Sequence, residues 1–248
     1  MDIAIDVGNT RTKAGVFEAG RMLEKSIFDH GDLDAIRRVC QKWQIQNAIV
    51  SNTGHLFFEM DDLPVKRNKI LLSHETSLPI VNLYHTPETL GKDRIASVVG
   101  AWSMFPNQAS FVIDAGTCVT YDLIDENGYY QGGNIAPGLN MRYQAMHHFT
   151  HALPLVTNEE AYEEGTDYPF LGRKTETALR HGGQVGMKYE IEGYIRALQT
   201  KFKQINIILT GGDAVFFDEC VKTKIFVIPD LVLTGLEGIL RFQKSAYE

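Results

Sequence analysis

The sequence predicts an α/β protein made of two duplicated halves, and three observations support this prediction. First, residues 1–17 contain two strand patterns around a polar turn, because apolar and polar residues alternate on both sides of a Gly-Asn pair. Second, the order of strand, Asp-x-Gly turn, strand, turn and strand returns 108 positions later. Third, helical patterns follow each of these units. An internal duplication explains this repetition.

The first half begins with these two strands, and its other elements follow from hydrophobic periodicity. A third strand, an amphipathic helix behind an Asp cap, a short buried strand, two extended segments and an apolar helix come next. The stretch leading to Pro64 has no clear pattern. The expected elements span residues 1–17, 21–28, 32–43, 47–51, 69–72, 81–84 and 91–106.

The second half repeats the three strands and is then mostly helical. Two helices, a strongly apolar strand, a Gly-Gly turn, the start of a helix, a short strand and a C-terminal helix follow the repeated strands. The expected elements span residues 110–113, 119–124, 129–134, 137–149, 175–202, 205–209, 210–213, 214–220, 225–228 and 231–242. Pro106-Asn107-Gln108 is the best candidate boundary. We therefore expect one half at residues 1–107 and the other at 108–248.

Composition excludes several classes of protein. The 248 residues are 44% hydrophobic and 22% charged, which is typical of a globular protein. The net charge of −7 argues against nucleic-acid binding, which needs a basic surface. No apolar run is long enough to span a membrane and no signal-peptide pattern is present, so we expect a cytoplasmic protein. Three scattered cysteines, Cys40, Cys118 and Cys220, indicate neither disulfides nor a metal site.

The turn after the first strand has the chemistry of a phosphate site. Backbone N–H groups of Gly8, Asn9 and Thr10 and the charge of Lys13 suit phosphate oxygens, and Asp6 suits a hydrated divalent cation. Phosphoryl transfer needs this inventory, because its catalysis is mostly positioning and charge neutralisation. The alternative is an ordinary hairpin whose lysine is merely solvated.

Two later turns strengthen the phosphate hypothesis. Asp114 repeats Asp6, and if the halves face each other, the two aspartates flank one cleft that fits a nucleotide. Gly211-Gly212 lies between a strand and a helix, where it offers either a flat surface for adenosine or a tight turn with Asp213 as helix cap. The P-loop and the G-x-G-x-x-G motif are absent from the sequence.

Gly91-Lys92-Asp93-Arg94 opens an apolar helix. Asp93 is either a helix cap or a base that accepts a proton from a substrate hydroxyl. Arg94 suits bidentate binding of a substrate carboxylate. The histidines at 147, 148 and 151 lack the other ligands of a zinc site, so a structural or interface role is favoured over a metal.

Together these motifs resemble those of type III pantothenate kinases, which belong to the superfamily of acetate and sugar kinases, Hsp70 and actin. Asp6–Lys13 matches the D-x-G-N-T-x-x-K motif, Leu90–Arg94 the G-x-D-R motif, Asp114–Thr117 the second phosphate motif and Gly211-Gly212 the adenosine turn. The resemblance spans nearly the whole chain. It implies two ribonuclease H-like halves, that is, an actin-like ATPase fold with a nucleotide cleft between them.

The resemblance also implies ATP-dependent phosphorylation of pantothenate to 4'-phosphopantothenate, the first step of coenzyme A synthesis. Asp93 would be the proton acceptor, Asp114 would bind potassium or ammonium, and Asp6 is a candidate magnesium ligand. Family members are homodimers, and here the helices of the second half would form the interface. ATP would be bound by Asp6, Val7, Gly8, Asn9, Thr10, Arg11, Thr12, Lys13, Thr117, Gly211 and Gly212, and pantothenate by Tyr84, Gly91, Lys92, Asp93, Arg94 and Thr175.

The sequence departs from the family pattern at one position, and three other functions stay open. Cys118 stands where an alanine often follows the second phosphate motif, and we expect it to leave activity intact but sensitive to thiol reagents. A non-catalytic regulator is disfavoured by the intact Asp93, Arg94 and Lys13. A nucleotide-driven protein of the Hsp70 or actin kind would leave the Asp93-Arg94 pair unexplained. A kinase for another small hydroxy acid would satisfy the same residues.

Overall fold

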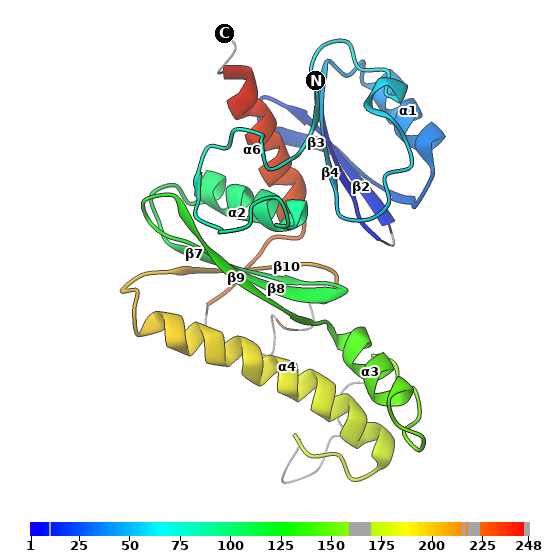
Figure 1. Cartoon of the computed structure of the whole chain (residues 1–248), viewed down its shortest axis with the longest axis vertical. Coiled ribbons are helices and arrows are strands. Elements are labelled where there is room, and N and C mark those ends of the chain that lie inside the picture. The colour runs from blue at the N-terminus through cyan, green and yellow to red at the C-terminus, as the bar shows by residue number, and fades with distance from the viewer. Residues whose placement is uncertain (10, 159–169, 215–216, 218–223, 246–248) are drawn as a thin grey trace. The chain divides into compact units, whose positions relative to one another are not determined.

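A computed structural model describes residues 1–9, 11–158, 170–214, 217 and 224–245 (Figure 1). The chain forms two compact units. The first comprises Met1–Ser110, Asp122–Gly132 and Asp230–Glu248, and the second comprises Phe111–Tyr121 and Gly133–Pro229. Both sheets and helices are present, so the predicted α/β class is confirmed. These units are defined by which residues pack together in space. The boundary expected near residue 107 divides the two copies of the sequence repeat, and it stays a prediction.

A five-stranded sheet organises the first unit. It contains β1 (Asp2–Val7), β2 (Arg11–Glu18), β3 (Arg21–Asp29), β4 (Asn47–Asn52) and β5 (Lys69–Leu71), in the order β3-β2-β1-β4-β5. β1 pairs antiparallel with β2 and parallel with β4. The register places Asp6 of β1 opposite both Lys13 of β2 and Ser51 of β4. Strand pairing therefore fixes the positions of Asp6, Lys13 and Ser51 beside the first turn.

Helices cover both faces of this sheet, and the alternation along β1 decides which residue meets which helix. Ile3 and Ile5 pack with Ile36 of α1 (Leu33–Lys42), which Asp32 caps by accepting a 2.9 Å hydrogen bond from the Ala35 N–H. Ala4 points to the opposite core, which α2 (Lys92–Met104) and α6 (Leu231–Ser245) supply. Figure 1 shows α1 on one side of the strands and α2 and α6 on the other.

Two glycines allow α2 and α6 to pack closely. A Cβ on Gly235 would lie 1.7 Å from the Ala96 carbonyl oxygen, and one on Gly100 would lie 2.5 Å from the Leu231 carbonyl oxygen. Backbone can approach backbone here only because both side chains are absent. This contact fixes the position of α2, whose first turn carries Asp93.

The second sheet has the order β11-β10-β7-β8-β9-β6. β8 and β9 are each divided between the two units. The part of β8 from Asp122 onward belongs to the first unit, and the part of β9 from Gly133 onward belongs to the second. The strands are β6 (Val81–Asn82), β7 (Ser110–Ala115), β8 (Cys118–Ile124), β9 (Tyr129–Pro137), β10 (Asn206–Thr210) and β11 (Phe226–Val227).

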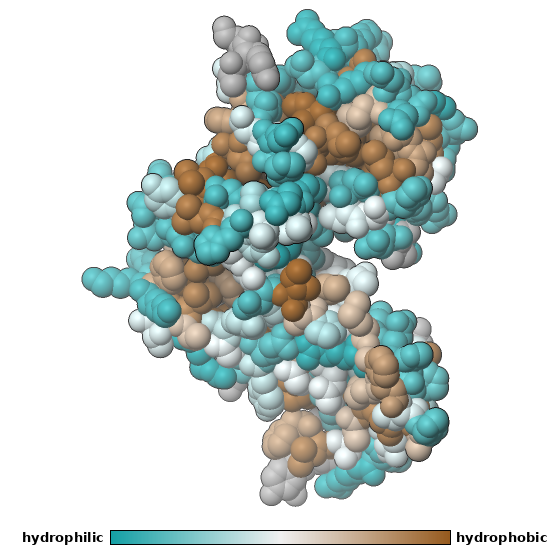
Figure 2. Space-filling view, viewed as in Figure 1, coloured by the Kyte–Doolittle hydropathy of each residue, from teal (hydrophilic) through white to brown (hydrophobic). Residues whose placement is uncertain are grey.

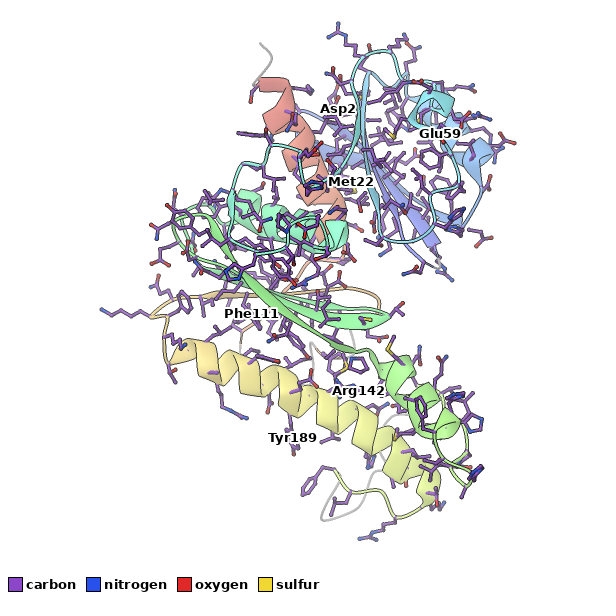
Figure 3. The ribbon with its side chains drawn as sticks, viewed as in Figure 1. Asp2, Met22, Glu59, Phe111, Arg142 and Tyr189 are labelled. Atoms are coloured by element: carbon purple, nitrogen blue, oxygen red, sulfur yellow. The ribbon has the colours of Figure 1, made fainter. Side chains whose placement is uncertain are left out.

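The second unit contains the helices α3 (Leu139–His148) and α4 (Thr175–Gln199). Tyr121 of β8 packs against Tyr194 of α4 at 4.4 Å between ring centroids and donates a 2.7 Å hydrogen bond to Glu190. Arg142 of α3, labelled in Figure 3, donates a 2.6 Å hydrogen bond to the other carboxylate oxygen of Glu190. Glu190 therefore links α3, α4 and the sheet.

The predicted elements that lie within the described residues are present, and most differences lie at their ends. The helix predicted from residue 137 begins at Leu139, because β9 continues to Pro137 and Gly138 adopts extended backbone. The stretch without a pattern contains a short 3₁₀ helix, Met60–Asp62. Ala214 is helical as predicted, but Cys220 lies outside the described residues. Within the described part of the chain, no helix is long and apolar enough to cross a membrane.

Candidate active site

The first phosphate turn follows from the pairing of three strands. The Ser51 hydroxyl donates a 2.8 Å hydrogen bond to Asp6 Oδ1, and Lys13 faces Asp6 across the β1–β2 pair. The Gly8 N–H donates to the Arg11 carbonyl at 3.1 Å, so this group closes the turn. This corrects our expectation that the Gly8 N–H is offered to a phosphate. Thr10 lies outside the described residues.

Other residues of the motif shape the turn from behind. Val7 and Thr12 are both fully buried and are register partners. Their side chains therefore support the turn from the core and are not exposed toward a ligand. Arg11 is exposed, and Asn9 is exposed at the tip. Strand alternation separates the motif into supporting and accessible positions.

Gly54 is a site residue that the sequence analysis missed. The Thr53 N–H donates a 3.0 Å hydrogen bond to the Val7 carbonyl. A Cβ on Gly54 would lie 2.8 Å from the Gly8 carbonyl oxygen and 3.2 Å from the Asn9 Cα. The loop after β4 thus braces the phosphate turn. The available signal was a Thr-Gly pair directly after a buried strand, in the stretch where we found no pattern.

Asp93 lies in the first turn of α2, but Gly91 is the N-cap residue and provides no side-chain cap. The Asp93 carboxylate accepts a 2.8 Å hydrogen bond from the Arg94 N–H. A Cβ on Gly91 would lie 2.6 Å from the Asp93 carboxylate, so glycine leaves room for that group. Lys92 donates a 3.0 Å hydrogen bond to the Leu90 carbonyl. Asp93 is therefore not the N-cap residue of α2, which was the first of the two roles that we considered for it.

Two carboxylates of the candidate site, Asp93 and Asp6, have raised pKa values. Burial raises the pKa of Asp93, and the negative charge of Asp122 raises it further, while the Arg94 N–H and side-chain charge oppose this. Burial also raises the pKa of Asp6 against the hydrogen bond from Ser51, and the charge of Asp93 adds to the rise. Asp6 and Asp93 are therefore close enough to interact, and a raised pKa makes Asp93 a stronger base.

Arg94 is almost fully buried, with 4% of its side chain exposed, and pairs with the fully buried Asp122. Its Nε and Nη2 atoms donate to Asp122 Oδ1 at 3.0 and 2.7 Å. Burial alone would lower the pKa of Arg94, but the bonds and charge of Asp122 more than offset this and raise it. The Tyr130 hydroxyl donates a 2.6 Å hydrogen bond to the same Asp122 oxygen, and the Tyr84 ring lies 5.6 Å from Arg94 Cζ.

Asp122 and Tyr130 were missed by the sequence analysis, which considered only the motif itself. A signal existed for Asp122. It is an acidic residue within the apolar β8 strand, and its neighbours Tyr121 and Ile124 are buried. A charge at such a position requires a partner.

The second phosphate motif and the glycine turn meet within the second unit. Gly211 has φ +96°, and a Cβ there would lie 2.3 Å from the Ala115 carbonyl oxygen and 2.5 Å from Asp114 Oδ1. The Asp213 N–H donates a 2.9 Å hydrogen bond to the Ala115 carbonyl. Glycine is therefore required at 211 by both conformation and space. The structure shows that Gly211 lies next to Asp114, whereas the sequence predicted only that both residues belong to the second half.

The turn at Thr117 is held by Gly138. The Gly138 N–H donates a 3.1 Å hydrogen bond to the Thr117 carbonyl, and a Cβ on Gly138 would lie 2.4 Å from the same oxygen. Cys118 follows as a half-buried free thiol. Thr175 begins α4 and is exposed. The start of α3 thus supports the second phosphate motif.

The histidines after Tyr143 lie at the end of α3 and in the loop that follows it. The ring Nδ1 of His147 forms a 2.8 Å hydrogen bond with the Leu153 carbonyl, which ties the following loop to α3. Among the described residues, no group of three or more His, Cys, Asp or Glu side chains is arranged to hold a metal ion. The structural or interface role that we favoured for these histidines stays a prediction.

The fold and these motifs define a class. The chain has the actin-like ATPase fold, shared with small-molecule kinases. Among solved structures, a Campylobacter jejuni protein described as a conserved Baf family transcriptional activator has a TM-score of 0.60 at 19% identity and covers 98% of this chain and 99% of its own. The activator of 2-hydroxyisocaproyl-CoA dehydratase from Clostridium difficile, with bound ADPNP, has a TM-score of 0.54 at 12% identity, covering 99% and 97%.

Sequence comparisons identify the family within this class. A family model described as type III pantothenate kinase matches residues 3–197. A type III pantothenate kinase from Bacteroides fragilis strain YCH46 is 44% identical over 249 residues and covers 99% of each chain. The chain belongs to the type III pantothenate kinase family, which confirms the resemblance found in the motifs.

Proposed function

We propose that this protein transfers the γ-phosphoryl group of ATP to the primary hydroxyl of pantothenate, with Asp93 as general base. One observation carries the proposal. A half-buried carboxylate with a raised pKa lies in the first turn of α2, next to Arg94 and close enough to Asp6 to raise the pKa of that residue. Proton acceptor, carboxylate-binding cation and phosphate turn therefore belong to one compact unit.

The reaction follows from the chemistry of these groups. Asp93 takes the proton of the substrate hydroxyl, the alkoxide oxygen bonds to the γ-phosphorus, and the bond from phosphorus to the β–γ bridging oxygen breaks to release ADP. Lys13 neutralises charge that develops on the phosphoryl oxygens. ATP contacts are assigned to the accessible positions of the first phosphate motif, Thr117 and Gly211-Gly212. Pantothenate contacts are assigned to Tyr84, Gly91, Lys92, Arg94 and Thr175.

The cation sites are also proposals, and the side chains fit them. Asp6 carries a carboxylate beside the Ser51 hydroxyl, an all-oxygen set that suits magnesium with its waters and phosphate ligands. Bound magnesium would shield the charges of the phosphates. Asp114 lies next to the Gly211 turn and supplies a carboxylate for potassium or ammonium. The Asp6 pKa is raised, which suits a carboxylate that becomes fully ionised when a cation binds.

We also propose a homodimer formed through the second unit. Large apolar side chains are exposed there, and Figure 2 shows several of them gathered over α3. Such a surface is typical of an interface. Among the described residues of this unit, the exposed large apolar side chains are Ile135, Met141, Phe149, Leu155, Phe170, Leu171 and Tyr189. We propose a cytoplasmic location, because ATP is available there and both described cysteines are free.

The test is release of ADP from ATP by the purified protein with magnesium, with and without pantothenate. We expect turnover only when pantothenate is present, and a phosphorylated product identified by mass spectrometry. Replacing potassium with sodium tests the cation site, and we expect slower turnover in sodium. ATP hydrolysis that ignores pantothenate would remove the substrate assignment, and absence of ATP binding would remove the assignment of the phosphate motif.

A further inference from the structure

The orientation of Arg94 is set by two residues outside the substrate motif. Arg94 donates to Asp122 through Nε and Nη2, which form one edge of the guanidinium group. A guanidinium group has five N–H donors in a fixed plane, so fixing one edge determines where the Nη1 end points. A substrate carboxylate would therefore meet the Nη1 end, since Asp122 holds the opposite edge.

Tyr130 fixes the acceptor in turn. Its hydroxyl donates to the Asp122 oxygen that also accepts from both arginine nitrogens, at 2.6 Å. Its ring stacks on Tyr84, with centroids 6.2 Å apart and an interplanar angle of 15°. Tyr130 is fully buried, with 0% exposure, and Tyr84 is partly buried against the same core. Tyr84 and Arg94, the two proposed substrate residues, thus share one support.

A buried ion pair is not by itself evidence for a functional role. Hydrophobic residues of similar volume can be as stable as such a pair, so stability does not require an arginine here. The location of the pair is the informative feature. Arg94 follows the proposed base directly, and Tyr84 covers its guanidinium group.

We infer that Asp122 and Tyr130 are positioning residues, which orient the Arg94 guanidinium and the Tyr84 ring toward the carboxylate of the substrate. This inference rests on the proposed function, because it assumes pantothenate as the substrate. It assigns preference for a carboxylate to two residues that act through Arg94 and Tyr84.

The experiment uses Tyr130→Phe, which removes one hydroxyl and leaves every charge in place. Binding constants from calorimetry and kcat/KM are measured for pantothenate and for its primary amide, which lacks the negative charge. A hydrogen bond to a charged group governs the orientation here, so we expect the preference for the acid over the amide to fall about tenfold. Affinity for the amide and the KM for ATP should stay close to wild type.

Tyr121→Phe is the matched control. Tyr121 is also buried, on strand β8, and its hydroxyl donates a 2.7 Å hydrogen bond to the Glu190 carboxylate within the second unit. The substitution therefore removes the same chemical group from a comparable environment. We expect the preference for acid over amide to remain that of the wild type.

The outcomes separate this inference from the proposed function. If wild-type protein does not phosphorylate pantothenate, the proposed function fails. If it does, and Tyr130→Phe keeps the preference or weakens acid and amide equally, only the positioning inference is overturned. Should Tyr130→Phe not fold, Asp122→Asn replaces it, because it removes the charge that holds the Nε–Nη2 edge and leaves Arg94 itself in place. Loss of preference in Asp122→Asn supports the inference, and a retained preference overturns it.

Discussion

The carboxylate of Asp93, in the first turn of α2, raises the pKa of Asp6, at the end of β1. Two acids distant in the sequence are thus neighbours. The close packing of α2 with α6, through Gly100 and Gly235, holds one of them, and pairing of β1 with β2 and β4 holds the other. Both acids are therefore held by regular secondary structure, one by helix packing and the other by strand pairing.

Asp93→Asn should abolish most activity without loss of stability. General bases contribute about 10²- to 10⁴-fold to rate, so kcat should fall by that range while substrate binding is kept. Because the folded pKa of Asp93 is raised, its ionisation opposes folding as pH rises through that pKa, and asparagine removes this effect. The melting temperature at neutral pH should equal or exceed that of the wild type. Steady-state kinetics and thermal unfolding measure both.

Asp34→Asn is the matched control for Asp93. Asp34 is also an acidic residue in the first turn of a helix, α1, but its side chain is 79% exposed. The control repeats any effect of removing charge from a helix N-terminus. A comparable loss of kcat in both variants would contradict the role of Asp93 as base.

Gly54→Ala should weaken ATP binding. The new Cβ would lie 2.8 Å from the Gly8 carbonyl oxygen, which is backbone and cannot rotate away. The phosphate turn must shift, and we expect the KM for ATP to rise about tenfold with a smaller change in the KM for pantothenate. Gly193→Ala is the control, since nothing lies within 4 Å of a Cβ there. Unchanged nucleotide affinity in Gly54→Ala would show that the turn does not depend on this brace.

Asp122→Asn should shift the acidic limb of the pH profile of kcat/KM to lower pH. Burial is the main cause of the raised pKa of Asp93, and the Asp122 charge is a further cause. Removing that charge leaves the Arg94 charge uncompensated, so the base ionises at lower pH. Tyr130→Phe keeps the charge, and its limb should stay in place. If the acidic limb moves equally in both variants, or in neither, the charge of Asp122 does not govern the ionisation of Asp93.

The sequence was sufficient for the elements and motifs but not for the partners of those motifs. Periodicity along β1 and a capping aspartate before α1 are local signals, so both elements were predictable. Asp122 was not connected with Arg94 because that pairing depends on where β8 passes α2 in space. Gly54 was missed for a similar reason, since its role is a close approach to Gly8 from another loop.

Expectations about individual donors depended on details of geometry. We expected the Gly8 N–H to face a phosphate, but the turn closes through this group, which donates to the Arg11 carbonyl. A motif lists residue types, whereas hydrogen bonds inside a tight turn decide which backbone groups remain for a ligand. The Gly211 turn was correctly placed after a strand, but its contact with Asp114 required the structure.

Glu237→Gln should stabilise the protein at neutral and alkaline pH. Glu237 lies in α6 with 6% of its side chain exposed, and burial raises its pKa, with the negative charge of Asp2 adding to the rise. Arg241 lies 3.9 Å away and Lys244 also opposes the shift, but these do not prevent it. Since the folded pKa lies above the unfolded one, ionisation lowers stability as pH rises through that window. Glutamine cannot ionise, so its advantage should be present above the folded pKa and should vanish below the unfolded pKa.

Thermal unfolding from about pH 4 to about pH 8 measures this effect, with Glu192→Gln as control. Glu192 makes the same i,i+4 pair with an arginine, Arg196, at 3.7 Å, but its side chain is 18% exposed. Because an exposed i,i+4 pair contributes little, its loss should leave stability nearly unchanged or slightly lower at all pH values. A gain in Glu237→Gln that grows with pH, and none in Glu192→Gln, would identify burial of the Glu237 charge as the cause. Destabilisation of Glu237→Gln at neutral pH would instead show that the pair with Arg241 outweighs burial.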